Sequence, residues 1–313
     1  MSNRYLIALG AGLAAGVLFM LPIKGMMAGV WLSVLAPMPL MIAVLGYGWL
    51  AGLIAAGVGA VACAVMQPTL GVIFLISTAG PALLLGWLAS HVFAGERQLG
   101  PGHLLAAVAG LAIAAVWGML AFVAVVHGDL EAAATEVASG LRQALQRMKG
   151  IEEGAAIMPV DEFVQWLVAS IPAIMAFWTV LAMSLNLWLA ARVAMISGLL
   201  NREWPDLPNT LVLPRVALGA FALATLACAL PGVTRVLAST AAVGLGLAFA
   251  FQGLAAIHRL TRGGSSRPGL LAALYALMFF VFPLPLFVAA GVGVADNVKP
   301  LRRSLPKPTS PNP

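Results

Sequence analysis

The stretch from Leu104 to Val126, LLAAVAGLAIAAVWGMLAFVAVV, decides the fold of this chain. It contains no charged side chain and exceeds the about 20 apolar residues that a helix needs to cross a bilayer. Apolar and polar residues do not alternate along it, as they would in a strand of a membrane β-barrel. The stretch therefore predicts a transmembrane α-helix.

Similar apolar runs fill most of the 313 residues. Of all residues, 62% are hydrophobic and 9% are charged, whereas soluble domains have about 45–50% and about 25%. This composition excludes a water-soluble domain and a nucleic-acid partner, and it predicts an all-α bundle of about eight or nine transmembrane helices in contact with the lipid bilayer. The expected spans are roughly Tyr5–Leu21, Met26–Leu45, Tyr47–Met66, Leu70–Val92, Leu104–Val126, Ile171–Val193, Val216–Leu230, Val236–Ile257 and Gly269–Ala295.

The positions of the charged residues predict an orientation. The loops 192–215 and 258–268 are rich in arginine, whereas the long loop 127–165 has a net charge of −4, from seven acidic and three basic residues. Because Lys and Arg are enriched in cytoplasmic loops, we expect the N-terminus in the cytoplasm and the 127–165 loop outside. The localisation that follows is a bacterial inner membrane.

The basic tail conflicts with this orientation, since nine spans would place it outside. Either the charge rule fails at the tail, or one apolar run does not cross the membrane. The candidates are the two runs interrupted by Pro-x-Pro, at Pro37–Pro39 and at Pro283–Pro285. Paired prolines remove backbone donors and favour a kink or a re-entrant break.

The chain is expected to divide into three parts. Residues 1–198 form a six-helix membrane bundle, residues 199–298 add three helices, and residues 299–313 form a basic, Pro-rich tail that is expected to be disordered. In the 127–165 loop, which belongs to the first part, apolar residues recur every three or four positions and predict an amphipathic helix outside the membrane. This helix is either a lid over a cavity or a connector packed on the bundle.

The expected spans contain no group that suggests catalysis. Every charged residue falls in a loop, a tail or the end of a span, so proton relays have no carboxylate or lysine to use. The four histidines lie at span ends without metal-ligand spacing, and no serine has the context of a nucleophile. We therefore expect no enzymatic activity, no metal and no cofactor.

Four neutral polar residues inside the spans are the candidate ligand-binding residues: Ser77, Thr78, Asn186 and Gln252. An unpaired amide in an apolar medium costs about 2–7 kcal/mol, so the two amides must have partners. Those partners are either neighbouring helices, as in ordinary packing, or a small uncharged ligand or head group. Both alternatives remain open at this point.

Small residues recur four positions apart in several runs, which lets helices approach closely, either within the bundle or against a partner subunit. The first run contains Ala11-x-x-x-Ala15 and Gly12-x-x-x-Gly16, and the third contains Ala55-x-x-x-Gly59.

Four stretches together suggest a family: Pro37-Met38-Pro39 through Gly59, Trp204-Pro205-Asp206-Leu207-Pro208 before Leu213-Pro214-Arg215, Phe251-Gln252-Gly253-Leu254-Ala255, and Gly291-Val292-Gly293-Val294-Ala295-Asp296. Over nearly the whole chain they resemble the YybS-like family of bacterial inner-membrane proteins, whose activity is unknown. The first six helices of that family are similar to the substrate-capture subunits of energy-coupling-factor transporters. The resemblance implies a non-enzymatic protein that captures a ligand from outside and docks onto a transmembrane partner through Ala11 and Ala15.

Three hypotheses follow for the function. The first is a transporter-like subunit that captures a small, largely neutral ligand between helices one to six, under the 127–165 loop. The alternative is a membrane scaffold that binds other proteins in envelope biogenesis or division. An enzyme acting on lipid-linked substrates fits worst, because acidic residues such as Asp161 and Glu162 lack partners that would tune them.

Overall fold

A computed structural model describes residues 3–24, 27–94, 100–147, 159–200 and 205–299. These residues form helices and connecting turns, with no strand among them, which confirms the expected all-α class. Seven helical stretches in this part of the chain are long and apolar enough to cross a membrane. They are Asn3–Ile23, Ala28–Tyr47, Trp49–Met66, Pro68–Val92, Pro101–His127, Val160–Ile196 and Val233–Leu260.

Two of these spans join two α-helices. The second joins α2 (Met27–Ser33) to α3 (Pro37–Tyr47), which begins at the first of the two paired prolines. The fourth joins α5 (Pro68–Phe74) through a π-helical turn, Leu75–Ala79, to α6 (Gly80–Ala94). Proline fits the first turn of a helix because its missing N–H has no intrahelical partner there.

The contact between α1 (Asn3–Met20) and α4 (Trp49–Met66) uses the small residues seen in the sequence. A side chain at Gly12 would collide with the backbone carbonyl of Ala55, and Gly16 lies against Gly59. The two four-residue repeats therefore bring two helices of the same chain together.

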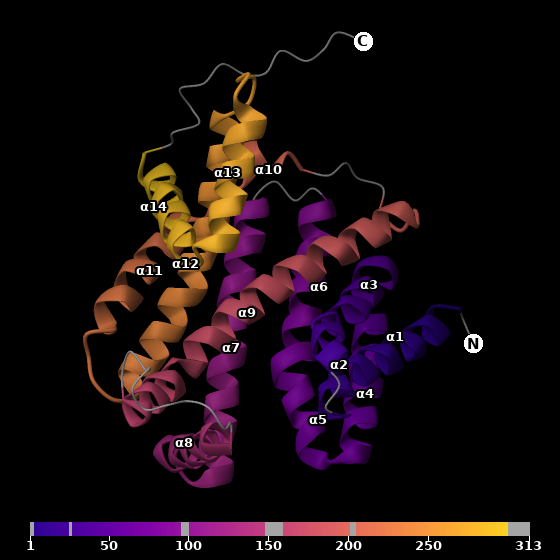
Figure 1. Ribbon diagram of the computed structural model, residues 1–313. Coiled ribbons are helices and arrows are strands. Elements are labelled where there is room, and N and C mark those ends of the chain that lie inside the picture. Colours follow the sequence, from indigo (N-terminus) through magenta and orange to yellow (C-terminus); the bar gives the residue numbers. More distant parts are fainter. Residues whose placement is uncertain (1–2, 25–26, 95–99, 148–158, 201–204, 300–313) are drawn as a thin grey trace.

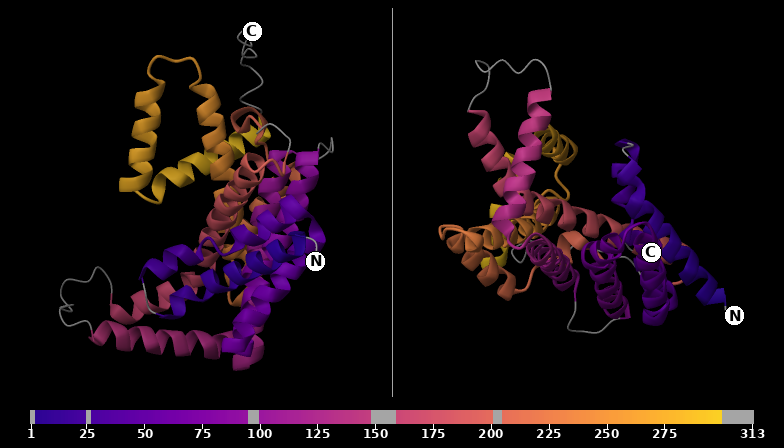
Figure 2. Two further views of the ribbon diagram at one scale, coloured as in Figure 1. Left: turned by 90° about the vertical axis from the view of Figure 1, so that its right-hand side faces the viewer. Right: turned by 90° about the horizontal axis from the view of Figure 1, so that it is seen from below.

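The last apolar run does not form the single span expected over Gly269–Ala295. It divides at 281–283 into α13 (Arg267–Phe280) and α14 (Leu284–Val298), each shorter than a span. The break coincides with the second Pro-x-Pro, because a proline interrupts the hydrogen-bonding pattern of a helix interior. Helix α13 descends from the turn after α12 (Val233–Leu260), and α14 returns to the same end of the molecule (Figures 1 and 2).

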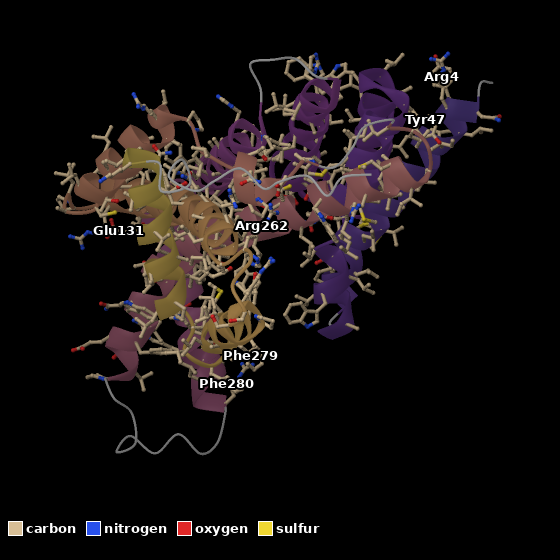
Figure 3. The ribbon with its side chains drawn as sticks, turned by 90° about the horizontal axis from the view of Figure 1, so that it is seen from above. Arg4, Tyr47, Glu131, Arg262, Phe279 and Phe280 are labelled. Atoms are coloured by element: carbon tan, nitrogen blue, oxygen red, sulfur yellow. The ribbon has the colours of Figure 1, made fainter. Side chains whose placement is uncertain are left out.

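Helix α14 packs closely along α12. Gly253 and Gly293 make this possible, because a Cβ atom at either position would collide with a backbone carbonyl of the other helix. In contrast, α13 has no buried residue, and its Phe279 and Phe280 are each 80% exposed. Seen from above, these two rings lie on the opposite side of the molecule from Arg4 and Tyr47, which belong to the N-terminal helices (Figure 3). Helix α11 (Arg215–Ala227) is shorter than the span expected there.

The bundle has two distinct ends. At the α8 end lie α8 (Leu130–Arg147) and the first turns of α9 (Val160–Ile196), which are joined by an Arg142–Asp161 ion pair of 2.7 Å (Figure 1). With 37 residues at about 1.5 Å each, α9 is much longer than a bilayer core. A helix, α8, is present within 127–165, and its place outside the membrane stays a prediction; residues 148–158 of that loop lie outside the described residues.

The opposite end, called the basic end here, holds the start of α7 (Pro101–His127), the ends of α9 and α12, and the turn 261–266. Two charged residues near this end are buried, Arg259 at 8% and Asp296 at 2% exposure. Their positions at the ends of apolar runs did not predict this burial. The C-terminal helices pack on α7 and α9 through α12, so the regions expected as 1–198 and 199–298 share one interior. Residues 300–313 of the expected tail lie outside the described residues.

Candidate functional site

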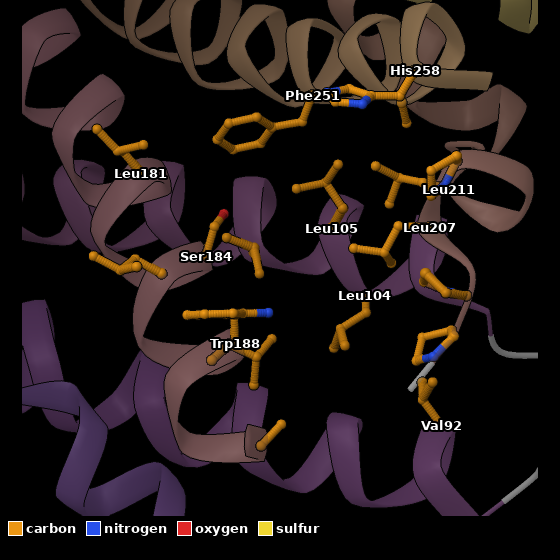
Figure 4. Close-up of a pocket in the computed structure, with 18 residues that line it drawn as sticks. Val92, Leu104, Leu105, Leu181, Ser184, Trp188, Leu207, Leu211, Phe251 and His258 are labelled. Carbon is orange, nitrogen blue, oxygen red and sulfur yellow. The ribbon is translucent and has the colours of Figure 1, made fainter. Parts of the chain in front are cut away.

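A cavity of about 580 Å³ lies near the basic end, between α7, α9 and α12 (Figure 4). Its fourth wall is the segment 205–214, called the strap here, which contains the short helix α10 (Leu207–Thr210). The helices contribute Val92, Pro101, Leu104, Leu105, Val108, Leu181, Ser184, Leu185, Leu187, Trp188, Ala191, Phe251, Ala255 and His258, and the strap contributes Pro205, Leu207, Pro208 and Leu211.

The lining is almost entirely apolar and includes no Asp, Glu, Lys or Arg. The hydroxyl oxygen of Ser184 is buried, has no hydrogen-bond partner, and points toward the cavity on the side of Phe251 (Figure 4). His258 stands at the wall formed by α12, and its Nε2 atom lies 2.7 Å from the hydroxyl of Tyr275 on α13. The cavity can therefore take an apolar group together with at most a few polar atoms.

The inner end of the strap is held by a buried set of hydrogen bonds. The backbone N–H of Leu213 donates to Oε1 of Gln252 at 2.9 Å, and Nδ2 of Asn297 donates to the carbonyl of Leu213 at 2.8 Å. Nε2 of Gln252 donates to Oδ2 of Asp296 at 3.0 Å. Buried backbone groups need such partners, so α12 and α14 together fix the strap at Leu213.

The start of the strap is held by an ion pair. Both guanidinium nitrogens of Arg262 donate to the carboxylate of Asp206, at 2.7 and 2.9 Å. This hydrogen bonding holds the pKa of Asp206 below its usual value, against the opposing effect of burial. The Asp206 side chain is 43% exposed, so solvent screens the pair and its contribution to stability is small.

The four candidate ligand residues do not come together, and none of them lines the cavity. Ser77 and Thr78 lie in the π-helical turn, where Ser77 donates to the carbonyl of Ile73 at 2.7 Å. Asn186 is fully buried and donates to the carbonyls of Val34 and Ala182, both at 2.7 Å.

Gln252 holds the strap, as described above. The partners found for both amides belong to the chain itself, whereas the buried Oδ1 of Asn186 has none. A role of the four residues in ligand binding stays a prediction.

The two candidate docking residues lie inside the bundle. Ala15 is fully buried and belongs to the hydrophobic core, and Ala11 is partly buried against the same core. These positions serve packing within the chain, and docking of a partner through them stays a prediction.

Sequence reasoning did not find the cavity. Leu104, Leu105, Phe251 and Ala255 are apolar residues in apolar helices, and nothing in their pattern separates them from residues that face lipid. Pro205, Leu207, Pro208, Phe251 and Ala255 lie in stretches that carry the family resemblance, but those stretches did not indicate a cavity. The cavity lies at the basic end, and a cavity between helices one to six under the 127–165 loop stays a prediction.

No metal site accompanies the cavity: within the described ranges, no group of three or more His, Cys, Asp or Glu side chains is placed to hold a metal ion. The fold and the cavity define a polytopic α-helical membrane protein with an apolar site between its helices. The chain belongs to the family described as "Predicted membrane protein (DUF2232)", whose model matches residues 13–297. No curated protein and no solved structure matches the chain.

Proposed function

We propose that this protein is a non-enzymatic, transporter-like subunit that captures a small, largely neutral ligand in the cavity near the basic end. One observation carries the proposal: the cavity is apolar, yet the buried hydroxyl of Ser184 has no hydrogen-bond partner. A buried polar group without a partner costs about 1–3 kcal/mol, which a ligand with one acceptor or donor would recover. The volume of about 580 Å³ lies within the usual range of small-molecule sites.

The contacts in the cavity wall do not favour catalysis. A serine nucleophile needs a hydrogen bond to a base, and the Ser184 hydroxyl has no partner. The Nε2 atom of His258 is engaged by Tyr275. The cavity therefore has the character of a binding site, and energy for transport would come from partner subunits.

The fold supports placing the basic end in the cytoplasm of a bacterium, with the protein in the inner membrane. The α13–α14 hairpin turns the chain back, so that α14 ends in the upper half of Figure 1, as the turn after α12 does, and this removes the conflict with the arginine-rich loops. The charge rule then assigns this end, and with it the N-terminus, to the cytoplasm.

A thermal unfolding screen of the purified full-length protein in detergent tests ligand capture. A compound that binds the native state raises the unfolding temperature. In the variant Ala255→Phe, a phenyl group enters the cavity from α12, and this variant is expected to lose the stabilisation. Ala114→Phe adds the same group on an exposed face of α7 and serves as the matched control. A compound that stabilises Ala255→Phe as well as the wild type, or a library without any stabilising compound, contradicts the proposal.

The alternative, a scaffold in envelope biogenesis or division, is favoured by the surface of the α8 end. The arm formed by α8 and the start of α9 projects from the bundle and exposes Val137, Phe163 and Trp166, at 48%, 37% and 59%. Tryptophan is frequent in protein interfaces. Under this alternative, Trp166→Ala reduces the amount of an envelope or division protein that co-purifies, and an unchanged amount speaks against it.

A further inference from the structure

We propose that the ligand of the cavity is the hydrocarbon chain of an anionic phospholipid, whose phosphate group lies beside Arg192 at the basic end. This inference rests on the proposed function and names the class of its ligand: the neutral chain is the part that the cavity takes, and the charged phosphate stays outside it. It follows from three observations: the chemistry of the lining, the opening of the cavity, and Arg192 next to it.

The lining selects the buried part of the ligand. A polar group of a ligand that is buried without a hydrogen-bond partner costs free energy. The cavity wall offers few hydrogen-bonding side chains beyond Ser184 and His258. A sugar, a nucleotide or an amino acid would leave several of its groups without a hydrogen bond. A hydrocarbon chain has no such groups and fills an apolar cavity by contact alone. The ester carbonyl at the head of a phospholipid chain supplies the one acceptor that Ser184 lacks.

The cavity opens on the surface of the bundle beside α9. Leu185 and Trp188 both line it, and each is 43% exposed. Because α9 is one of the spans, this surface faces hydrocarbon when the protein is in a bilayer. A lipid chain can therefore enter sideways from the membrane without crossing water.

Arg192, next to the lining, supplies the charge that favours an anionic head group. Its guanidinium lies 6.0 Å from the centre of the Trp188 ring, one helical turn beyond the cavity wall. Arg262 adds little to this charge, because it is already paired with Asp206, which stands between the lining residues Pro205 and Leu207. Basic residues at a membrane surface attract anionic lipids.

Native mass spectrometry of the delipidated full-length protein tests the inference by titration. The probes are phosphatidylglycerol, phosphatidylcholine with the same chains, and glycerol phosphate without chains. We expect phosphatidylglycerol to bind about fivefold more tightly than phosphatidylcholine, the effect of one arginine near an anionic lipid. Glycerol phosphate is expected not to bind, which separates a lipid from a free phosphate ester.

Three variants locate the bound lipid. Ala255→Phe is expected to weaken binding of both lipids by about tenfold or more, because the added ring occupies the space of the chain. Ala114→Phe, on the exposed face of α7, leaves binding unchanged. Arg192→Gln removes the preference for phosphatidylglycerol and leaves phosphatidylcholine binding as it was. If Ala255→Phe does not yield folded protein, Ser184→Leu fills the same cavity from α9.

The outcomes separate this inference from the proposed function. Equal binding of phosphatidylglycerol by the wild type and Ala255→Phe places the lipid elsewhere on the surface and overturns the inference. Equal binding of both lipids by the wild type overturns the assignment of an anionic head group. If neither lipid binds but a neutral compound stabilises the wild type and not Ala255→Phe, the inference fails and the proposed function stands. If glycerol phosphate alone binds, the ligand is a free phosphate ester and the inference fails.

Discussion

Replacing Gln252 by glutamate is expected to weaken the inner anchor of the strap. The Gln252 side chain is fully buried, accepts from the N–H of Leu213 at 2.9 Å and donates to Asp296 at 3.0 Å. A glutamate has nearly the same shape and still accepts from Leu213. It can no longer donate through an amide to Asp296, and two carboxyl groups then face each other in a buried place, where both cannot easily be ionised.

The size of the effect follows from these contacts. Losing a hydrogen bond to an acidic group costs about 1.5–3 kcal/mol of unfolding free energy, and this is the loss expected for Gln252→Glu. Gln252→Ala also leaves the N–H of Leu213 without a partner, which adds about 1–3 kcal/mol. Asp296→Asn combined with Gln252→Glu restores a donor and an acceptor with their direction reversed, and we expect the double variant to recover most of the loss.

The assay is chemical unfolding of the full-length protein in detergent micelles, evaluated as a double-mutant cycle. Gln67→Glu introduces the same chemical change on an exposed side chain and is the control, with an expected change within about 0.5 kcal/mol. If Gln252→Glu is as stable as the wild type, or if Asp296→Asn does not rescue it, the hydrogen-bonded anchor described here is wrong.

Three further predictions concern the ion pair, the helix contact and the hairpin. Because the folded-state pKa of Asp206 is lowered, its ion pair stabilises the protein at neutral pH, and this stabilisation is lost as the pH falls below about 4. The wild type is expected to lose under about 1 kcal/mol of unfolding free energy in this way. Asp206→Asn is expected to lack this loss when thermal unfolding is followed against pH. Gly12→Ala is expected to cost about 1–3 kcal/mol because its Cβ meets the backbone of α4, whereas Gly10→Ala, which meets nothing, leaves the unfolding free energy nearly unchanged. Cysteines introduced at Lys299 and Ser265 are expected to react with a membrane-impermeant reagent from the same side, and labelling from opposite sides contradicts the hairpin.

The helices could be predicted from the sequence because the length and apolar character of each run are direct consequences of bilayer thickness. Leu104–Val126 lies within α7, and the amphipathic pattern in the 127–165 loop corresponds to α8. Both Pro-x-Pro pairs lie in runs that do not form one helix. The run at 283–285 divides into α13 and α14, each shorter than a span, whereas the second candidate span continues past 37–39, because Pro37 begins α3 there.

The site could be predicted only in part, because its contacts join residues far apart in the chain. Burial made it certain that the amide of Gln252 needed partners, and these are Leu213 and Asp296, 39 and 44 positions away. No local sequence pattern predicts such a pairing. The cavity was missed for a related reason: residues such as Leu105 and Phe251 have the same composition whether they face a cavity, a neighbouring helix or lipid. Only the packing of three helices and the strap distinguishes them.

The cavity as a ligand site is tested most directly by mass spectrometry of the organic extract of protein purified from its native membrane. The wild type and Ala114→Phe are expected to release a lipid in near-equal amount to the protein, and Ala255→Phe is expected to release far less. The same amount of lipid from all three proteins, or none from the wild type, would contradict the assignment of a lipid to this cavity.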